Sequence, residues 1–303
     1  MVFMPFVMYS VIDVIAITYD FIISMKVSGE KMNAISVNSK NSIYQKFEVL
    51  KSNRNKRHRY NEFFVEGVRN INEAIKNNWK IKSFIYRKDC LSDWAKNIIQ
   101  GVQTQNNYLL APELMKELSG KEDTSELMAI IEMREESLQK VSLAQQPFIV
   151  LFDRPSNKGN LGTLIRSCDA FGVDLLIATG HSIDIYDPDV VVSSMGSFFN
   201  IPTLHISDNR ALFKYFEWLK KEYPNIQFIG TTSHKKVPIY NQNLKTPIVL
   251  MIGNETYGLN KTYKEYCDTL CSIPMSEKSY ATSFNVSCAA SIVMYEITKQ
   301  NTN

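Results

Sequence analysis

Three short segments of the chain combine glycine with side chains that bind ligands or carry charge. Each lies at, or shortly after, the end of an apolar run. Glycine lets the backbone approach a ligand closely, while arginine, glutamate and asparagine supply charge and hydrogen bonds. A glycine-rich turn after a strand usually indicates a site for a nucleotide phosphate. The segments are 157–166 (NKGNLGTLIR), 253–259 (GNETYGL) and 283–287 (SFNVS).

The first segment lacks the other residues of the common nucleotide-binding motifs. Gly159 and Gly162 are not followed by the third glycine of the dinucleotide fingerprint, and no Gly-Lys-Ser/Thr follows as in a P-loop. This argues against an ordinary nucleotide-binding oxidoreductase or hydrolase. Three such segments in this order, at the ends of successive strands, indicate a different type of site.

The elements that must position these segments form an α/β domain. Such a domain alternates strands with helices and is typical of a mostly parallel sheet covered on both faces. Ligands bind these sheets beyond the carboxyl ends of the strands, where the three segments lie. Apolar runs predict strands at 148–152, 174–178, 227–230, 248–252 and 269–273.

The length of 303 residues favours two domains with separate cores. The first is a small α/β domain, for which the pattern predicts strands at 63–65 and 81–86 and a helix at 68–77. We divide the chain into an N-terminal extension (1–43), this first domain (44–134), a polar linker (135–147) and the second domain (148–303).

The apolar start of the chain, residues 1–24, does not read as a membrane span. Asp13 and Asp20 interrupt it, and neither a positive start nor a small-residue cleavage site marks a secretory signal. We expect no membrane association and interpret the segment as a non-essential extension. A weak membrane or partner anchor is the alternative.

Charge and cysteine content bear on the partners and the cellular compartment that we expect. The net charge of +3 is too small to identify a partner, but segment 51–59 (KSNRNKRHR) holds five lysines and arginines. That density suits phosphate contacts, and a solvated loop is the alternative. The five cysteines are odd in number and show no paired spacing with histidines. We therefore expect a reduced, cytoplasmic protein without a metal site.

The three segments resemble the motifs of the SpoU family of RNA ribose methyltransferases, which belong to the knotted SPOUT class. The resemblance covers residues 148 to about 298, and more weakly 47–51 (FEVLK) and 63–69 (FFVEGVR) in the first domain. It implies a small RNA-binding domain followed by a mostly parallel α/β domain with a C-terminal trefoil knot. It also implies S-adenosylmethionine as cofactor and a homodimer formed through the C-terminal domain.

The activity that the resemblance implies is 2′-O-methylation of a ribose in structured RNA. Ribosomal RNA is the expected substrate, because the first domain is similar in type to ribosomal proteins that bind kinked RNA. A transfer-RNA methyltransferase is one alternative. A non-catalytic RNA-binding protein of the same fold is another, although the presence of Asn157, Arg166, Glu255 and Asn285 together argues against it.

The resemblance also assigns roles to individual residues. Asn157 and Arg166 would face the RNA, and Arg166 would hold a phosphate and stabilise the alkoxide at the 2′ oxygen. Glu255 would order the loops or contact the substrate, with helix capping as the alternative. Asn285 would hydrogen-bond to the first segment, cap a helix as Ser283 would, or do both. The cofactor would contact Gly253, Ile273, Met275 and Phe284. Apart from the resemblance, the charge density of segment 51–59 makes Lys56, Arg57 and Arg59 the candidates for contacts with RNA phosphates.

The chain departs from the family pattern after Met275. The loop to Ser283 is longer than usual and contains no glycine, which affects the expected contacts to the adenosine. Aromatic residues near the site could stack on unpaired bases, and Phe198, Phe199 and Tyr257 are the candidates. Core packing is the alternative that we favour for Phe198 and Phe199.

Overall fold

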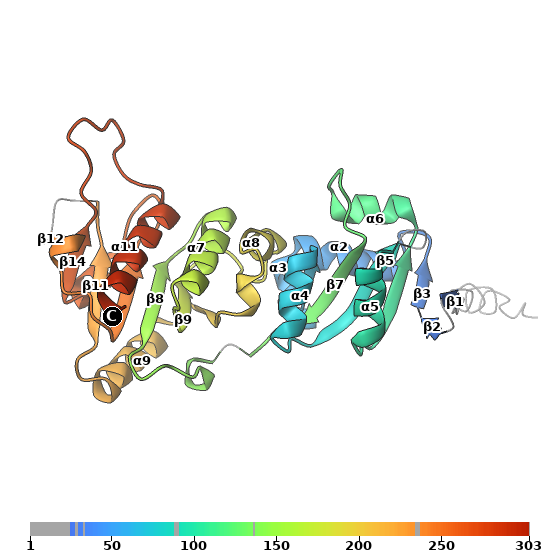
Figure 1. Ribbon diagram of the computed structural model, residues 1–303, viewed down its shortest axis with the longest axis horizontal. Coiled ribbons are helices and arrows are strands. Elements are labelled where there is room, and N and C mark those ends of the chain that lie inside the picture. The colour runs from blue at the N-terminus through green and yellow to red at the C-terminus, as the bar shows by residue number, and fades with distance from the viewer. Residues whose placement is uncertain are drawn as a thin grey trace, which may run out of the picture. The chain divides into compact units, whose positions relative to one another are not determined.

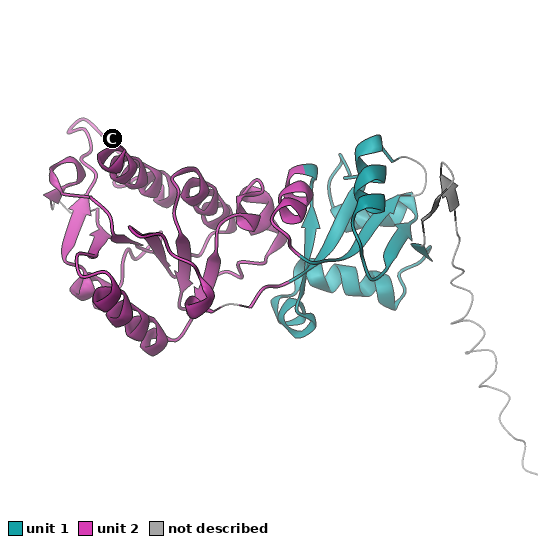
Figure 2. Cartoon of the chain, turned by 60° about the horizontal axis from the view of Figure 1, so that its bottom comes forward, with its two compact units in different colours: residues 1–68, 80–132 teal, residues 69–79, 133–303 magenta. Residues whose placement is uncertain are grey.

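The computed structural model describes residues 25–27, 30–32, 34–87, 91–135, 137–233 and 237–302. The apolar start of the chain, residues 1–24, lies outside these ranges. The chain divides into two compact units, coloured separately in Figure 2. The first holds the residues up to Val68 and Lys80–Glu132, and the second holds Arg69–Trp79 and the chain from Met133 onward.

The first unit is built on a mixed five-stranded sheet with the order β3-β6-β5-β7-β4. β6 runs parallel to β3 and β5, whereas β7 is antiparallel to β5 and β4. The predicted strands at 63–65 and 81–86 are confirmed as β4 and β5. The strands are β3 (Ala34–Val37), β4 (Glu62–Glu66), β5 (Ile81–Arg87), β6 (Asn107–Leu110) and β7 (Leu127–Glu132).

Helices α2 and α6 pack on this sheet around a buried core that includes Phe47, Phe64 and Met115. Separate from the sheet, β1 (Met25–Val27) and β2 (Glu30–Met32) form an antiparallel pair. The helices are α2 (Ser42–Ser52), α3 (Arg54–Tyr60), α5 (Asp93–Gly101) and α6 (Pro112–Ser119).

Residues 69–79 belong to the second unit through aromatic packing. The predicted helix at 68–77 is confirmed as α4 (Val68–Lys76). After it, Trp79 Nε1 donates to the carbonyl of Phe199 at 2.9 Å, and its ring lies 5.6 Å from Phe198 and 5.4 Å from Phe199. Both phenylalanines are 2% exposed, which confirms that they pack in the core. They are therefore not available to stack on RNA bases. The domain boundaries drawn from the sequence stay a prediction.

The second unit contains a seven-stranded sheet with the order β10-β9-β8-β13-β11-β14-β12. Every pairing in it is parallel, as predicted. The sequence did not predict β10 and β12, which are the two edge strands. The strands are β8 (Phe148–Asp153), β9 (Leu175–Thr179), β10 (Thr203–Ile206), β11 (Gln227–Thr231), β12 (Val237–Pro238), β13 (Ile248–Ile252) and β14 (Thr269–Ser272).

Helices cover both faces of this sheet, so all residues of β8, β9 and β13 are buried. Figures 1 and 2 show α7 and α11 on the face opposite α9. Ser167 of α7 and Ser291 of α11 share a 2.9 Å hydrogen bond between their hydroxyl groups. The helices are α7 (Lys158–Ala170), α8 (Pro188–Ser193), α9 (Asn209–Glu222), α10 (Lys261–Tyr266) and α11 (Val286–Asn301), with 3-10 turns η1 (Leu138–Lys140), η2 (Ser197–Phe199) and η3 (Ile239–Asn241).

The strand order brings the three segments together. β8 and β13 are neighbours, and β11 alone separates β13 from β14. Because these strands are parallel, the loops that follow them leave from the same edge of the sheet. The trefoil knot expected at the C-terminal end stays a prediction.

Gly162 sets how closely α7 and α8 pack. A Cβ atom at this position would lie 1.9 Å from Ser193 Oγ and 2.5 Å from the carbonyl oxygen of Val190. We expect Gly162→Ala to lower the free energy of unfolding by about 1–3 kcal/mol, because a backbone carbonyl cannot move aside without shifting α8. Urea unfolding followed by circular dichroism measures this.

Gly159→Ala is the matched control on the same helix. Its Cβ would meet only the side chain of Asn157, at 3.3 Å. We expect a change within about 1 kcal/mol, since alanine also favours the helix. Equal stability of the two variants would contradict the steric explanation.

Candidate functional site

A cavity of about 860 Å³ opens at the carboxyl ends of β11, β13 and β14. Its walls come from the loops after these strands and from the start of α11. Gly253, Ile273, Met275 and Phe284, which the sequence predicts to bind a cofactor, all line it. Ser283 and Glu255 line it as well. The structure therefore brings the second and third segments to one cavity of a size typical for small-molecule sites.

The cavity wall combines apolar side chains with polar groups. Ile273 and Met275 are half-buried, and Phe284, two residues before the start of α11, is exposed. Thr231 and Ser272 add hydroxyl groups at the ends of β11 and β14. An apolar wall beside a few polar atoms suits a ligand that carries both an aromatic ring and hydrogen-bonding groups.

Gly253 is required by the turn that follows it. The backbones of Asn254 and Gly258 pair through two hydrogen bonds of 3.1 and 2.9 Å, which folds the chain back on itself. A Cβ atom at Gly253 would lie 2.1 Å from the nitrogen of Leu259 and 2.3 Å from the carbonyl carbon of Gly258. Close approach of a ligand is the expected reason for this glycine, but the structure shows that the protein's own backbone already excludes a side chain.

Glu255 joins the turn after β13 to the loop after β8. Its Oε2 accepts from the hydroxyl of Ser156 at 2.7 Å, and its Oε1 accepts from Asn160 Nδ2 at 3.3 Å. The following helix, α10, is capped by Asn260. The interpretation of Glu255 as a helix cap is therefore wrong, and the observed contacts are those of a residue that orders two loops.

Asn160 links all three segments. Its side chain donates to Glu255 and accepts from Asn285 Nδ2 at 3.1 Å, and its carbonyl accepts from the hydroxyl of Ser287 at 2.9 Å. Asn285 also caps α11 by accepting from the amides of Ser287 and Cys288. Both predicted roles of Asn285, helix cap and partner of the first segment, are confirmed. We call Asn160, Glu255 and Asn285 the loop triad.

Asn160 was not selected from the sequence, which singled out Asn157 in the same segment. The side chain of Asn157 accepts from the amide of Asn160 at 2.9 Å and so caps α7. The available signal was the presence of two asparagines three positions apart at a helix start. One of them caps the helix, which leaves the other free for long-range contacts.

Arg166 lies beyond the loop triad on α7. At 1.5 Å per residue it sits about 9 Å further along the helix axis than Asn160. Its side chain is exposed and makes no hydrogen bond or ion pair with any residue that the structure describes. The guanidinium is therefore available to an external anion.

An ion pair between the buried Asp153 and the half-buried Arg154 helps to fix the loops of the site. Asp153 is 1% exposed and accepts two 2.8 Å hydrogen bonds from Arg154, which raise the pKa of the Arg154 guanidinium. Asp153 also accepts from the amide of Asn260 at 2.9 Å, and the carbonyl of Arg154 accepts from Asn254 Nδ2 at 2.7 Å. These bonds attach the turn after β13 to the end of β8. Sequence reasoning did not select this pair.

The basic segment of the first unit is not uniform. Arg57 is 1% exposed, and its guanidinium donates to the carbonyls of Leu50 and Lys51 at 3.1 and 3.2 Å. The prediction that Arg57 contacts RNA phosphates is corrected on this ground, because its charge is used to cap the end of α2. Lys56 is half-buried and Arg59 exposed, both on α3.

The cysteines and acidic residues provide no metal site in the described ranges. There, no group of three or more His, Cys, Asp or Glu side chains is arranged to hold a metal ion. Cys168, Cys267, Cys271 and Cys288 are free thiols. Burial raises the pKa of Cys271, at the cavity wall, to about 11. Within the same ranges, every helix is too short or too polar to span a bilayer.

Comparison with known proteins identifies both units. The SpoU rRNA Methylase family matches residues 147–295, and the SpoU L30e-like domain matches residues 41–129. A 23S rRNA (uridine(2479)-2′-O)-methyltransferase of Streptomyces viridochromogenes is 36% identical over 275 residues, which cover 90% of this chain and 95% of the relative. The 23S rRNA (guanosine(2553)-2′-O)-methyltransferase RlmP of Bacillus subtilis is 27% identical over 78% of this chain and 88% of its own.

Solved structures agree with this assignment. The crystal structure of the SpoU methyltransferase AviRb from Streptomyces viridochromogenes, in complex with the cofactor AdoMet, superposes with a TM-score of 0.79 at 35% identity. The alignment covers 86% of this chain and 98% of AviRb. With a relative above 30% identity across nearly its whole length, this chain belongs to the SpoU family of RNA methyltransferases.

Proposed function

We propose that this protein transfers the methyl group of S-adenosylmethionine to the 2′-hydroxyl of a ribose in ribosomal RNA. The observation that carries the proposal is the joining of all three segments by the loop triad beside a ligand-sized cavity. Ribosomal RNA is preferred over transfer RNA because both relatives described above are named as 23S rRNA 2′-O-methyltransferases.

The residues that line the cavity fit the cofactor. Ile273 and Met275 offer apolar surface to an adenine ring, and the backbone at the ends of β13 and β14 supplies donors and acceptors. Phe284, exposed at the cavity wall, would add a further apolar surface for the cofactor. When bound, the cofactor supplies an electrophilic methyl group on sulfur. The protein needs only to hold the ribose oxygen in line with it.

Arg166 is the residue that we assign to the RNA. Its exposed guanidinium, which has no partner among the described residues, can hold a phosphate and stabilise negative charge on the 2′ oxygen as the hydroxyl gives up its proton, for which the held phosphate is the candidate acceptor. Asn160, Glu255 and Asn285 act as positioning residues, because their side chains are occupied with one another. Asn157 acts through the start of α7.

Replacing Arg166 and Phe284 separates transfer from cofactor binding. We expect Arg166→Ala to leave the affinity for S-adenosylmethionine within twofold and to lower single-turnover methylation about 10²- to 10³-fold, as for a lost transition-state donor. We expect Phe284→Ala to weaken cofactor binding, since it removes apolar cavity wall. Calorimetry and transfer of labelled methyl to unmodified 23S rRNA measure the two effects.

Arg166→Lys is the matched variant, and it should recover little activity because an ammonium cannot form the planar fork. Wild-type turnover of Arg166→Ala at saturating RNA would make the residue a binding contact only. Methylation of transfer RNA instead, or cofactor binding without transfer to either RNA, would favour the corresponding alternative function.

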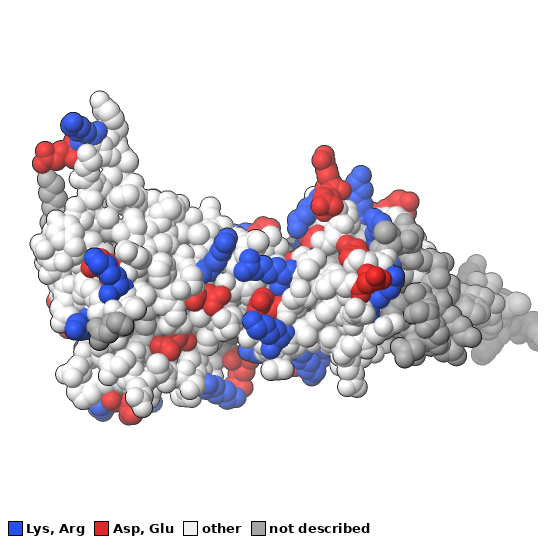
Figure 3. Space-filling view, viewed as in Figure 1, with Lys and Arg blue, Asp and Glu red and all other residues white. Residues whose placement is uncertain are grey.

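The first domain, residues 44–134, is proposed to bind the RNA substrate and residues 148–303 to methylate it. On the face drawn in Figure 3, positive and negative side chains alternate over the first unit, so net charge alone does not single out a surface. Lys56 and Arg59 remain the candidates for phosphate contacts, because both reach solvent on α3.

Replacing Lys56 and Arg59 together by alanine should weaken RNA binding without lowering the rate at saturating RNA. The slope of log affinity against log salt should fall by roughly one to two, since each phosphate contact contributes somewhat less than one. Filter binding at several salt concentrations measures this slope. Lys96→Ala, a solvent-reaching cation on α5 paired with Asp93, is the control and should leave it unchanged. An unaltered slope in the double variant would exclude these contacts.

A homodimer formed through the C-terminal domain is proposed as the active species. Ile292 and Tyr295 are large apolar side chains exposed on α11, a feature typical of interfaces. Light scattering at micromolar concentration should give twice the mass of one chain, and Ile292→Asp should lower it. A fully active monomer would contradict this proposal.

A further inference from the structure

Tyr257 is an aromatic residue presented to solvent beside the cavity. It is 78% exposed and lines the cavity together with Glu255, two positions earlier. Its hydroxyl has no hydrogen-bond partner and its ring no aromatic contact within the described part of the chain. Burying such a ring against a partner would release a large apolar surface from water.

The turn that carries Tyr257 is rigid. Asn254 Oδ1 accepts from the amides of Thr256 and Tyr257 at 2.9 and 3.1 Å, and the turn is closed by the backbone pairing of Asn254 with Gly258. Asn254 is in turn held to the carbonyl of Arg154. The backbone under the ring is therefore fixed before any ligand arrives, so little entropy is lost when the ring is covered.

We propose that Tyr257 is the stacking platform for the base of the methylated nucleotide. This inference rests on the proposed function. A ribose whose 2′ oxygen reaches the cavity carries its base only a few bonds away, and sequence-specific RNA recognition targets nucleotides whose bases are unstacked. An unpaired base is bound by stacking on an aromatic side chain. Of the aromatic residues that the sequence nominated, Phe198 and Phe199 are buried, which leaves Tyr257.

The test is steady-state methylation of unmodified 23S rRNA by the full chain. Tyr257→Ala should raise the KM for RNA about tenfold or more and change kcat much less, because stacking binds the base without touching the transferred group. Tyr257→Phe should restore the wild-type KM, since the ring and not the hydroxyl is used. The affinity for S-adenosylmethionine, measured by calorimetry, should change much less than the KM for RNA, because the Tyr257 side chain is 78% exposed and so offers the cavity little surface.

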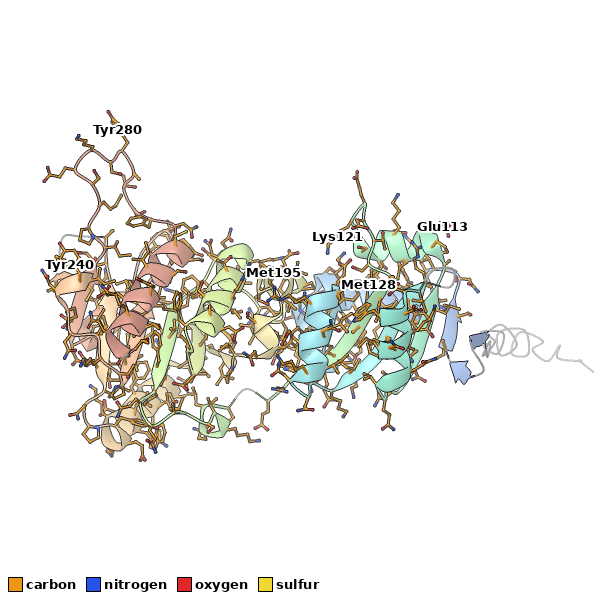
Figure 4. The ribbon with its side chains drawn as sticks, in the orientation of Figure 1. Glu113, Lys121, Met128, Met195, Tyr240 and Tyr280 are labelled. Atoms are coloured by element: carbon orange, nitrogen blue, oxygen red, sulfur yellow. The ribbon has the colours of Figure 1, made fainter. Side chains whose placement is uncertain are left out.

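Tyr280→Ala is the matched control. Tyr280 is fully exposed and lies at the outer end of the loop between β14 and α11, as Figure 4 shows. It should behave as wild type. A wild-type KM in Tyr257→Ala, an equal defect in Tyr280→Ala, or a monomer on light scattering of Tyr257→Ala would each overturn the inference. An inactive wild-type protein would instead overturn the proposed function, and the inference with it.

Discussion

The site depends on one side-chain amide. Asn160 donates to Glu255 on the turn after β13 and accepts from Asn285 at the start of α11, and it lies itself in the first turn of α7. Because an amide has both a donor and an acceptor end, it can join a carboxylate to another amide where a charged residue could not. Removing Asn160 would leave the two partners without a common contact.

Steric limits make this contact possible. The turn from Asn254 to Gly258 folds back so tightly that Gly253 can carry no side chain, and Glu255 sits within that turn. Beneath it, the buried Asp153 receives both Arg154 and the amide of Asn260. A buried carboxylate needs such partners, and here they come from the segments that follow β8 and β13. The ion pair and the loop triad thus both connect the loop after β8 to the turn after β13.

The side chains around the site are of two kinds: those that hydrogen-bond within the protein, and those that are exposed and can contact an RNA. The side chains of the loop triad hydrogen-bond to one another. The side chains of Arg166 and Tyr257 are exposed, and neither has a hydrogen-bond partner in the described ranges. Groups of the first kind set geometry, and groups of the second kind can meet an RNA. The basic segment of α3 shows the same division on a smaller scale: Arg57 caps α2 from inside the fold, and its neighbour Arg59 faces water.

The sequence by itself determined β4 and β5 of the first sheet, the five inner strands of the second sheet with their parallel direction, and the three segments at the ends of those strands. Apolar period and glycine position are local properties, so they can be read along the chain. The edge strands β10 and β12 escaped because they are short and only partly buried. Only the tertiary structure decided that Asn160 and not Asn157 bridges the loops, that Arg57 is buried, and why Gly253 is glycine. Each of these depends on which other groups of the folded chain lie against the residue, and the sequence alone does not give those contacts.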